Sequence, residues 1–159
     1  MIDLKKLKFF LVKAKKQTYA SNGKKTTPQR KGFKEFEFRK GDWYYKDSYS
    51  GFFMAPGQEV VYFKNEPVWS MSYNGGMLSD YMKKKFAKKT FSFLKECLLN
   101  VNENNPFRGP KKFQKETWKY LNSFTGDIKN FKGTEKIFFN QNLVFKQNYI
   151  GGLIIHAQR

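Results

Sequence analysis

The chain has 159 residues, 40% hydrophobic and 19% aromatic, so it can enclose a core and lacks a disordered composition. Lysine and arginine number 31 against 13 acidic residues, which gives a formal net charge of +18. This charge favours a polyanionic partner: nucleic acid, an anionic membrane surface or an acidic protein. One cysteine, Cys97, and one histidine, His156, exclude an internal disulfide and a standard four-ligand structural zinc site.

The hydrophobic pattern contains no segment that would span a bilayer, which needs about 18–20 apolar residues. The apolar run at residues 9–12 is also too short for the hydrophobic region of a signal peptide. We therefore expect a soluble, cytoplasmic protein without a membrane span.

The N-terminal segment predicts a helix from an Asp3 N-cap to about residue 16. Leu7, Phe10, Leu11 and Ala14 fall at i, i+3, i+4 and i+7, which places them on one apolar stripe. Six lysines of the segment are expected mostly on the remaining helix surface: Lys5, Lys6, Lys8, Lys13, Lys15 and Lys16.

Residues 21–28 have the composition of a loop, and this loop carries Lys24 and Lys25. The alternation of apolar and polar residues at 36–39 then predicts a strand. A turn at residues 40–42 separates this strand from the next segment.

A sequence repeat dominates the rest of the chain. Residues 43–51 return at 118–126, 75 positions later, and residues 57–59 return at 133–135, 76 positions later. Short turn-like connections divide each copy into four expected strands: 43–47, 51–54, 59–63 and 68–73, and then 117–122, 126–129, 136–139 and 144–149.

A second helix is expected from about residue 80 to 99, capped by Ser79. Five lysines lie in or near its first two turns, where they repel one another and oppose the helix dipole: Lys83, Lys84, Lys85, Lys88 and Lys89. Stability alone would not select this arrangement, so it indicates a surface that faces an anion. A solvated, lysine-rich face without a partner is the alternative.

These elements predict an α+β fold built from a duplicated unit of one helix plus a four-stranded antiparallel meander. The two units, residues 1–78 and 79–159, would form one domain around a pseudo-two-fold axis, with the helices covering one face of the curled sheet or sheets. We favour edge-to-edge pairing of the two sheets because it would remove two exposed edges.

Three sets of residues are candidate functional groups. Polyanion contacts are expected from basic residues of the loops and the second helix: Lys24, Lys25, Arg30, Lys83, Lys84, Lys85, Lys88, Lys89, Arg108, Lys111 and Lys112. A ligand pocket could instead be lined by the repeated aromatic residues, which could equally be core: Trp43, Tyr45, Tyr73, Trp118, Tyr120 and Tyr149. The repeated pair Glu59 and Glu135 is a weak candidate for acid–base catalysis, and structural hydrogen bonds are its ordinary role.

Several segments together resemble a prokaryotic family catalogued as domain of unknown function 5680: residues 10–15, 41–45, 57–61, 67–76, 106–110 and 151–154. The resemblance spans most of the chain and implies no established chemistry. Some members of that family follow a helix-turn-helix DNA-binding domain, which implies a sensor or effector role in regulation. This chain shows no added helix-turn-helix segment.

Our first functional hypothesis is a non-enzymatic, basic binding module for a polyanion, most readily nucleic acid or a nucleic-acid-bound complex. The alternative is a small-molecule sensor or effector domain with an aromatic-lined pocket between the repeats, for a small anionic or aromatic ligand. A small toxin or nuclease-like enzyme is a weaker alternative. No cofactor or metal is expected.

Overall fold

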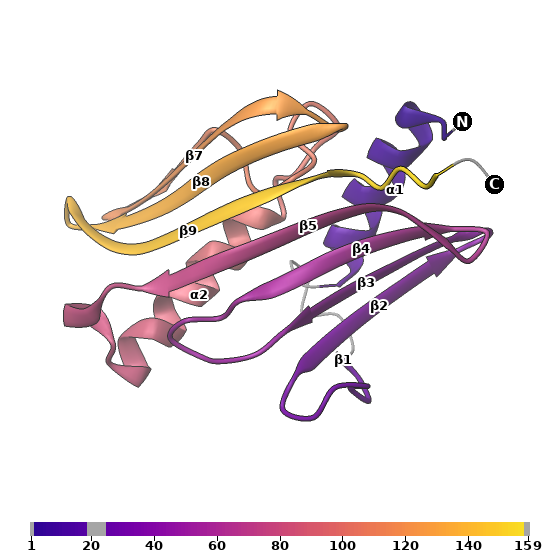
Figure 1. Cartoon of the computed structure of the whole chain (residues 1–159). Helices are drawn as coiled ribbons and strands as arrows, with labels where there is room; N and C mark the ends of the chain where they lie inside the picture. The colour runs from indigo at the N-terminus through magenta and orange to yellow at the C-terminus, as the bar shows by residue number, and fades with distance from the viewer. Residues whose placement is uncertain (1, 19–24, 158–159) are drawn as a thin grey trace.

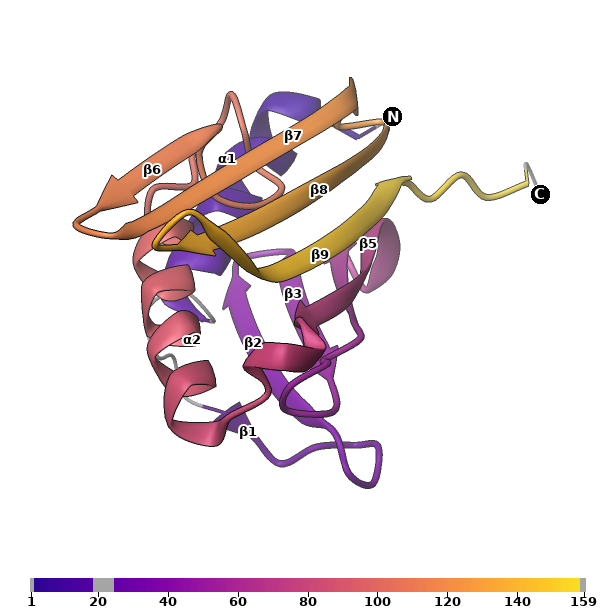
Figure 2. The same cartoon turned by 90° about the vertical axis from the view of Figure 1, so that its left-hand side faces the viewer.

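The computed structural model describes residues 2–18 and 25–157. Within these residues the strands form one antiparallel sheet in the order β1-β2-β3-β4-β5-β9-β8-β7-β6. The elements are α1 (Leu4–Gln17), β1 (Lys25–Thr26), β2 (Lys34–Lys40), β3 (Trp43–Tyr49), β4 (Gly57–Phe63), β5 (Glu66–Met77), α2 (Lys84–Leu98), β6 (Lys112–Lys115), β7 (Trp118–Asp127), β8 (Asn130–Phe139) and β9 (Asn142–Leu153). The sheet is strongly twisted, and both helices lie on its inner side (Figures 1 and 2).

Helix α1 forms as predicted. Asp3 accepts hydrogen bonds from the backbone N–H groups of Lys5 and Lys6, at 2.9 and 3.0 Å, and so caps the helix. The apolar stripe is buried against β2 and β3. Lys15 is also buried, at 7% exposure, although we expected it on the helix surface.

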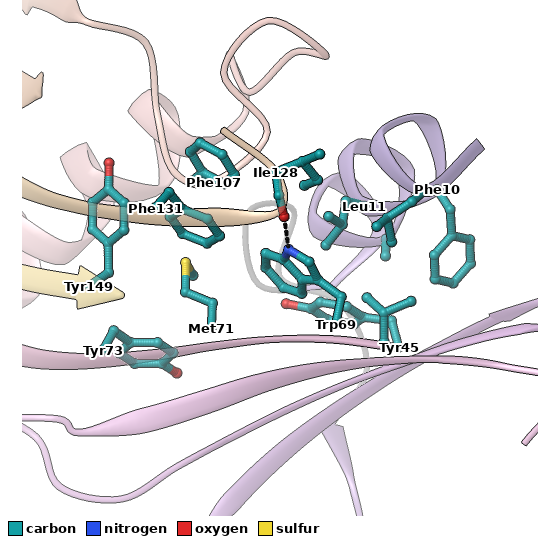
Figure 3. Packing of buried hydrophobic residues seen from close by; sticks show 13 residues of the cluster. Phe10, Leu11, Tyr45, Trp69, Met71, Tyr73, Phe107, Ile128, Phe131 and Tyr149 are labelled. Carbon is teal, nitrogen blue, oxygen red and sulfur yellow. Dashed lines mark hydrogen bonds between the residues drawn. The ribbon is translucent and has the colours of Figure 1, made fainter. Parts of the chain in front are cut away.

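The inner face of the sheet carries the core because alternate residues of each strand point to the same side. Under α1, Trp69 stacks on Phe131 with 5.7 Å between ring centroids, and its indole N–H donates to the Ile128 carbonyl at 3.2 Å (Figure 3). Under α2, a second cluster includes Phe93 and Tyr120. Each helix therefore covers a different part of one sheet.

The two halves of the sheet meet where β5 pairs with β9. Tyr73 lies opposite Tyr149 in this pairing, and Trp69 lies opposite Leu153. The expected edge-to-edge joining of the strands is therefore confirmed, and it places both former edges in the sheet interior.

The predicted duplication of a helix plus a four-stranded meander is wrong. Residues 51–54 form no strand, since only Met54 makes an isolated bridge to Gly76. Residues 126 and 127 end β7, and residues 128 and 129 form the turn between β7 and β8. Gly51, in the loop after β3, and Gly126, near the end of β7, have φ values of 102° and 89°, a conformation that favours glycine. The strands belong to one continuous sheet, and β2 and β6 supply strands ahead of the repeated segments.

The second helix starts later than predicted. Ser79 begins a short 3-10 turn, Ser79–Tyr81, and its hydroxyl hydrogen-bonds the neighbouring Asp80 carboxylate at 3.3 Å. Helix α2 then begins after Lys83, without a side-chain cap. Neither α1 nor α2, nor any other helical segment in the described ranges, is long and apolar enough to cross a membrane.

Candidate functional site

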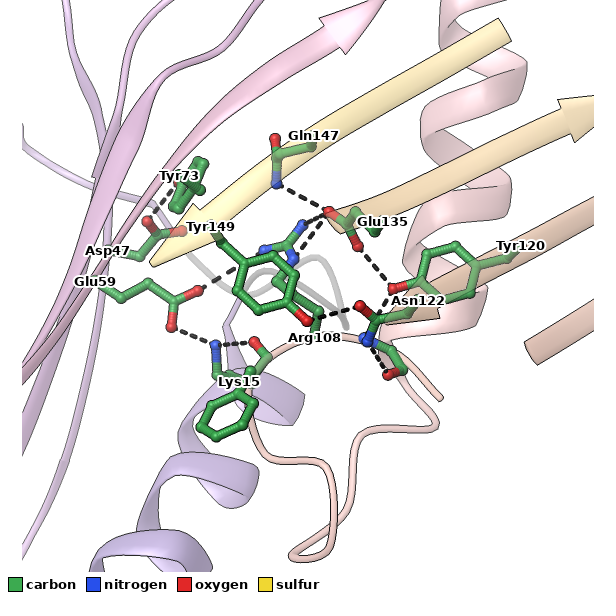
Figure 4. A network of polar contacts seen from close by, with 12 residues as sticks. Lys15, Asp47, Glu59, Tyr73, Arg108, Tyr120, Asn122, Glu135, Gln147 and Tyr149 are labelled. Carbon is green, nitrogen blue, oxygen red and sulfur yellow. Dashed lines mark hydrogen bonds and ion pairs between the residues drawn. The ribbon is translucent and has the colours of Figure 1, made fainter. Parts of the chain in front are cut away.

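A buried polar network fills the space between the sheet and the helices. Its ionisable members are Lys15, Asp47, Glu59, Arg108 and Glu135, all at most 7% exposed (Figure 4). Strand alternation explains part of this placement, because Asp47 and Glu59 are direct cross-strand partners on β3 and β4. We call these five residues the buried network.

Arg108 connects the two halves of the buried network. Its Nη2 and Nε atoms lie 2.7 and 2.9 Å from Oε1 of Glu135, and its Nη1 atom lies 3.8 Å from Oε1 of Glu59. Glu135 also accepts hydrogen bonds from the Tyr120 hydroxyl at 2.7 Å and the Gln147 side-chain amide at 2.9 Å. The Glu135 carboxyl is therefore fixed in place by hydrogen bonds from three side chains.

Lys15 connects α1 to the same network. Its ammonium group hydrogen-bonds Glu59 and donates to the Phe107 carbonyl at 2.8 Å. Burial lowers the pKa of Lys15, while the carboxylate of Glu59 opposes that change. Glu59 is thus paired with Lys15 and lies near a second basic residue, Arg108.

Asp47 has a different environment from the two glutamates. Oδ1 of Asp47 accepts a 2.7 Å hydrogen bond from the Tyr73 hydroxyl. At the repeated position the chain carries Asn122, whose Oδ1 accepts the same kind of bond from Tyr149, also at 2.7 Å. A neutral amide can therefore make the structural hydrogen bond that Asp47 makes.

The charges of the buried network do not balance if every group is ionised. It contains three carboxyl groups, Asp47, Glu59 and Glu135, against the two cations Lys15 and Arg108. Burial and, next, the negative charge of Glu59 together raise the pKa of the Asp47 carboxyl to about 7. Asp47 is therefore the carboxyl whose charge the network does not match.

Asp47 lines a cavity of about 180 Å³ between the sheet and α2, which we call the α2 cavity. Asp47, Tyr73, Arg108 and Gln147 contribute polar groups to it. Its apolar wall comes from the loop after β3, from α2 and from β9: Phe52, Phe53, Phe91, Leu94 and Phe145. Lys34 and Lys95 add two lysines to the lining. An apolar cavity with a few convergent polar groups is typical of a small-molecule site.

Two larger hollows are open surface grooves. One, of about 630 Å³, lies over the outer face of β5, β9, β8 and β7, and the other, of about 830 Å³, runs between α1 and the β2–β3 turn. Neither is lined by a member of the buried network. We therefore consider the α2 cavity the better site for chemistry or ligand recognition.

A second, much smaller space lies beside Lys15, Tyr45, Glu59 and Arg108. Its volume of about 10 Å³ is near the minimum for one water molecule. The Tyr45 hydroxyl is fully buried and makes no hydrogen bond of normal geometry among the described residues. Burial raises the pKa of Tyr45 well above its ordinary value, and the charge of Glu59 adds to this shift.

The predicted polyanion residues are distributed over three environments. Five lysines at the start of α2 and two at the start of β6 are exposed: Lys83, Lys84, Lys85, Lys88, Lys89, Lys111 and Lys112. Arg30 lies over the Phe33 ring at 4.1 Å and donates to the Ser48 hydroxyl at 2.7 Å, and Arg108 belongs to the buried network. Lys24 and the side chain of Lys25 lie outside the described residues.

The six repeated aromatic residues do not line one common pocket, although Tyr73 and Tyr149 both line the groove of about 630 Å³. Trp43 stacks on Phe10 under α1, at 5.4 Å, and Trp118 stacks on Phe86 under α2, at 5.7 Å. Tyr45, Tyr120 and Tyr149 are core residues. Of the six predicted pocket residues, Tyr73 is the one that lines the α2 cavity.

Sequence reasoning missed the residues that distinguish this site. Asp47 was treated only as part of the repeat, although Tyr45 and Asp47 alternate toward the same face of β3. Lys15 lies four and eight positions after Leu11 and Leu7, which places it on the buried helical face. Both signals were in the sequence, but nothing in it showed that Arg108 would join them from a distant loop.

Comparison with known proteins identifies a family for the chain but no activity. A family model described as Domain of unknown function (DUF5680) matches residues 47–154, more than half of the chain. No curated protein and no solved structure matches. The matched region contains Asp47, Glu59, Arg108, Glu135 and every residue of the α2 cavity except Lys34.

Proposed function

We propose that this chain, which belongs to the DUF5680 family, is a non-enzymatic binding domain for a small organic ligand. The binding site is the α2 cavity. The observation that carries the proposal is the position of Asp47, a buried carboxyl without a matching cation in the wall of an aromatic-lined cavity.

Stability gives no reason to keep a carboxyl at this position. Asn122 shows that an amide makes the same hydrogen bond to a tyrosine without bringing a buried charge. Burying a carboxyl that lacks its own cation costs free energy. Groups whose ionisation is perturbed in a cavity are concentrated at functional sites, which supports a role for Asp47 in recognition.

Protein-observed NMR with a library of small planar compounds tests this proposal. Ligands of the α2 cavity should shift the backbone amides of Gly51, Gly75 and Gly76, which line it. An Ala55→Phe variant should weaken these ligands because the larger side chain fills the cavity, whereas Ser92→Ala, on the exposed face of α2, should not. A library without a single compound that shifts these amides would contradict the proposal.

A second proposal concerns the surface of the protein: the exposed start of α2 binds a polyanion such as single-stranded nucleic acid. The supporting observation is that Lys83, Lys84, Lys85, Lys88 and Lys89 are all exposed within one short segment. Concentrated positive charge of this kind attracts phosphates and releases their counterions on binding.

Binding of a labelled oligonucleotide, measured by fluorescence anisotropy over a range of salt concentrations, tests the second proposal. A triple variant, Lys84→Gln, Lys85→Gln and Lys88→Gln, should bind a single-stranded oligonucleotide more weakly. The slope of log K against log salt concentration should become less steep by up to about 0.7 per lost phosphate contact. The charge-matched control changes three exposed lysines of the β7–β8 turn, β8 and β9: Lys129, Lys132 and Lys146. Equal losses in both triple variants would show that net charge, and not the start of α2, determines binding.

A further inference from the structure

We propose that the α2 cavity selects a small planar ligand with an amidine-type N–H donor edge, which Asp47 and Gln147 recognise. This inference rests on the proposed small-ligand function and names the class of ligand.

Two side chains of the cavity lining, Asp47 and Gln147, carry acceptor oxygens. The Tyr73 hydroxyl bonds Oδ1 of Asp47, but a carboxylate has about four lone-pair positions, so further donors can bind it. The Gln147 amide nitrogen donates to Glu135. Its side-chain carbonyl oxygen is the remaining acceptor of Gln147, a residue of the cavity lining.

Arg108 lines the cavity but does not make it an anion site. Its guanidinium is committed to Glu135 through two nitrogens and lies near Glu59. An anionic ligand in this cavity would add a fourth negative group to a network with two cations. A cationic or strongly donating ligand would instead complete the charge balance of three carboxyls with a third positive group.

The size and walls of the cavity favour a single flat ring. Its volume of about 180 Å³ equals about six water molecules, at about 30 Å³ each. Phe52 meets Phe53 and Phe91 edge to face, with ring centroids 5.0 and 5.5 Å apart. Aromatic walls in this arrangement accept the face or edge of a further ring.

The two lysines of the lining set the orientation of such a ligand. Lys34 lies above the Tyr49 ring at 5.5 Å, and its Nζ atom is 3.4 Å from the Gly51 carbonyl. Positive charge on Lys34 and Lys95 opposes a cationic group beside them, while the carboxyl of Asp47 attracts it. The donor edge should therefore face Asp47, with the rest of the ring against the phenylalanines.

Benzamidine and benzoate provide the test because they have the same shape and opposite charge. Each probe is titrated into the full-length protein, and binding is measured from the amide shifts of Gly51, Gly75 and Gly76. Benzamidine should bind in the cavity at least about tenfold more tightly than benzoate, because benzamidine can donate a charge-assisted hydrogen bond to Asp47 and benzoate cannot. Asp47→Asn should remove this preference, whereas the exposed Glu66→Gln, at the distant start of β5, should retain it.

The outcomes separate the ligand class from the proposed function. Benzoate binding as tightly as benzamidine, or benzamidine binding unchanged in Asp47→Asn, would overturn the ligand class and leave the cavity as a binding site. Absence of cavity shifts with either probe, or with any library compound, would overturn both. The comparison of the two probes on the unaltered protein needs no variant, so it decides the question even if Asp47→Asn does not fold.

Discussion

Asp47 and Asn122 show how one atom changes the role of a buried side chain. Both accept a 2.7 Å hydrogen bond from a tyrosine, and they differ in that an aspartate can ionise. Because Lys15 and Arg108 already serve Glu59 and Glu135, ionised Asp47 leaves the buried network with an excess negative charge. This excess negative charge in the wall of the α2 cavity favours a ligand that donates hydrogen bonds.

Replacing Asp47 with asparagine should stabilise the protein in a pH-dependent manner. The pKa of Asp47 is about 7 in the folded chain against an ordinary 3.8, so the stability gained by holding the proton is present below about pH 4 and is lost as the pH rises through 7. The asparagine side chain cannot ionise, so the variant does not lose stability in this way. Its free energy of unfolding should exceed that of the natural protein by on the order of 2–4 kcal/mol at pH 8, and by less at pH 5. Urea unfolding at both pH values measures the effect.

The exposed Asp127→Asn variant is the control for Asp47→Asn, because it removes a carboxylate that lies in solvent. Its effect on stability should be small and nearly the same at pH 5 and pH 8. An Asp47→Asn effect that is equally independent of pH would contradict the assignment of Asp47 as the unmatched carboxyl.

Arg108→Met should be one of the most destabilising single substitutions. It leaves Glu59 and Glu135 buried without the guanidinium between them, a loss of about 3–5 kcal/mol. Arg39→Met is the matched control, since Arg39 is exposed and lies over the Tyr44 ring at 4.6 Å, and it should cost less than about 1 kcal/mol. Similar losses of unfolding free energy in both variants would show that the buried network does not depend on Arg108.

At the scale of elements, the α2 cavity exists because the loop after β3 docks on β5. The backbone N–H of Met77 donates to the Phe53 carbonyl at 2.8 Å, and that of Ala55 donates to the Gly75 carbonyl at 3.0 Å. A Cβ atom at Gly76 would lie 1.9 Å from the Phe53 oxygen. This close approach therefore requires glycine.

Gly76→Ala should displace the loop, cost about 1–3 kcal/mol of stability and weaken any ligand of the α2 cavity. Gly152→Ala is a matched control, because a Cβ atom there would lie 2.2 Å from the Lys129 carbonyl oxygen, in a part of the sheet that does not line the cavity. The two variants should lose comparable stability by thermal unfolding, while only Gly76→Ala loses ligand affinity by NMR. Loss of affinity in both would mean that general destabilisation, and not the loop, controls binding.

The sequence predicted the elements better than their arrangement. The Asp3 cap, the apolar stripe of α1 and most strands followed from local patterns. The two short strands expected at 51–54 and 126–129 were wrong because residues 51–54 lie in the loop after β3, while residues 126–129 span the end of β7 and the turn to β8. The duplicated-unit fold failed because a sequence repeat shows which residues recur, but not how many strands join one sheet.

The candidate site was predictable only in part, for a physical reason. Glu59 and Glu135 were identified by the repeat, but their partners come from α1 and from the loop before β6. Periodicity places Lys15 on the buried face of α1, but no local pattern pairs it with Glu59 or brings Arg108 to Glu135. The basic residue Arg108 was assigned to the surface for the same reason, because charge suggests exposure unless a buried partner is known.

At the scale of the whole molecule, the interior and the surface carry opposite excesses of charged groups. The buried network holds more carboxyls than cations, while exposed lysines dominate the surface and account for the formal net charge of +18. Lys13 and Lys40 illustrate the crowding, because hydrogen bonding and repulsion between the two lysines lower the pKa of Lys13. The surface is therefore under electrostatic repulsion that a polyanion would relieve.

Salt should stabilise the free protein for this reason. Raising the ionic strength from about 0.01 M to 0.15 M shortens the screening length from about 30 Å to about 8 Å and weakens repulsion between distant lysines. The melting temperature should rise over this range, and it should rise less in the Lys84→Gln, Lys85→Gln, Lys88→Gln variant. A melting temperature that falls with salt would show that surface attraction outweighs repulsion.

The central claim is that the α2 cavity, with Asp47 in its wall, is a ligand site. Crystals of the full-length protein soaked with many different small planar fragments test it most directly. The account predicts that bound fragments gather between Phe53, Phe91 and Asp47, with N–H donors directed at the Asp47 carboxyl. Fragments found only in the surface grooves or between molecules, with the α2 cavity holding water alone, would contradict it.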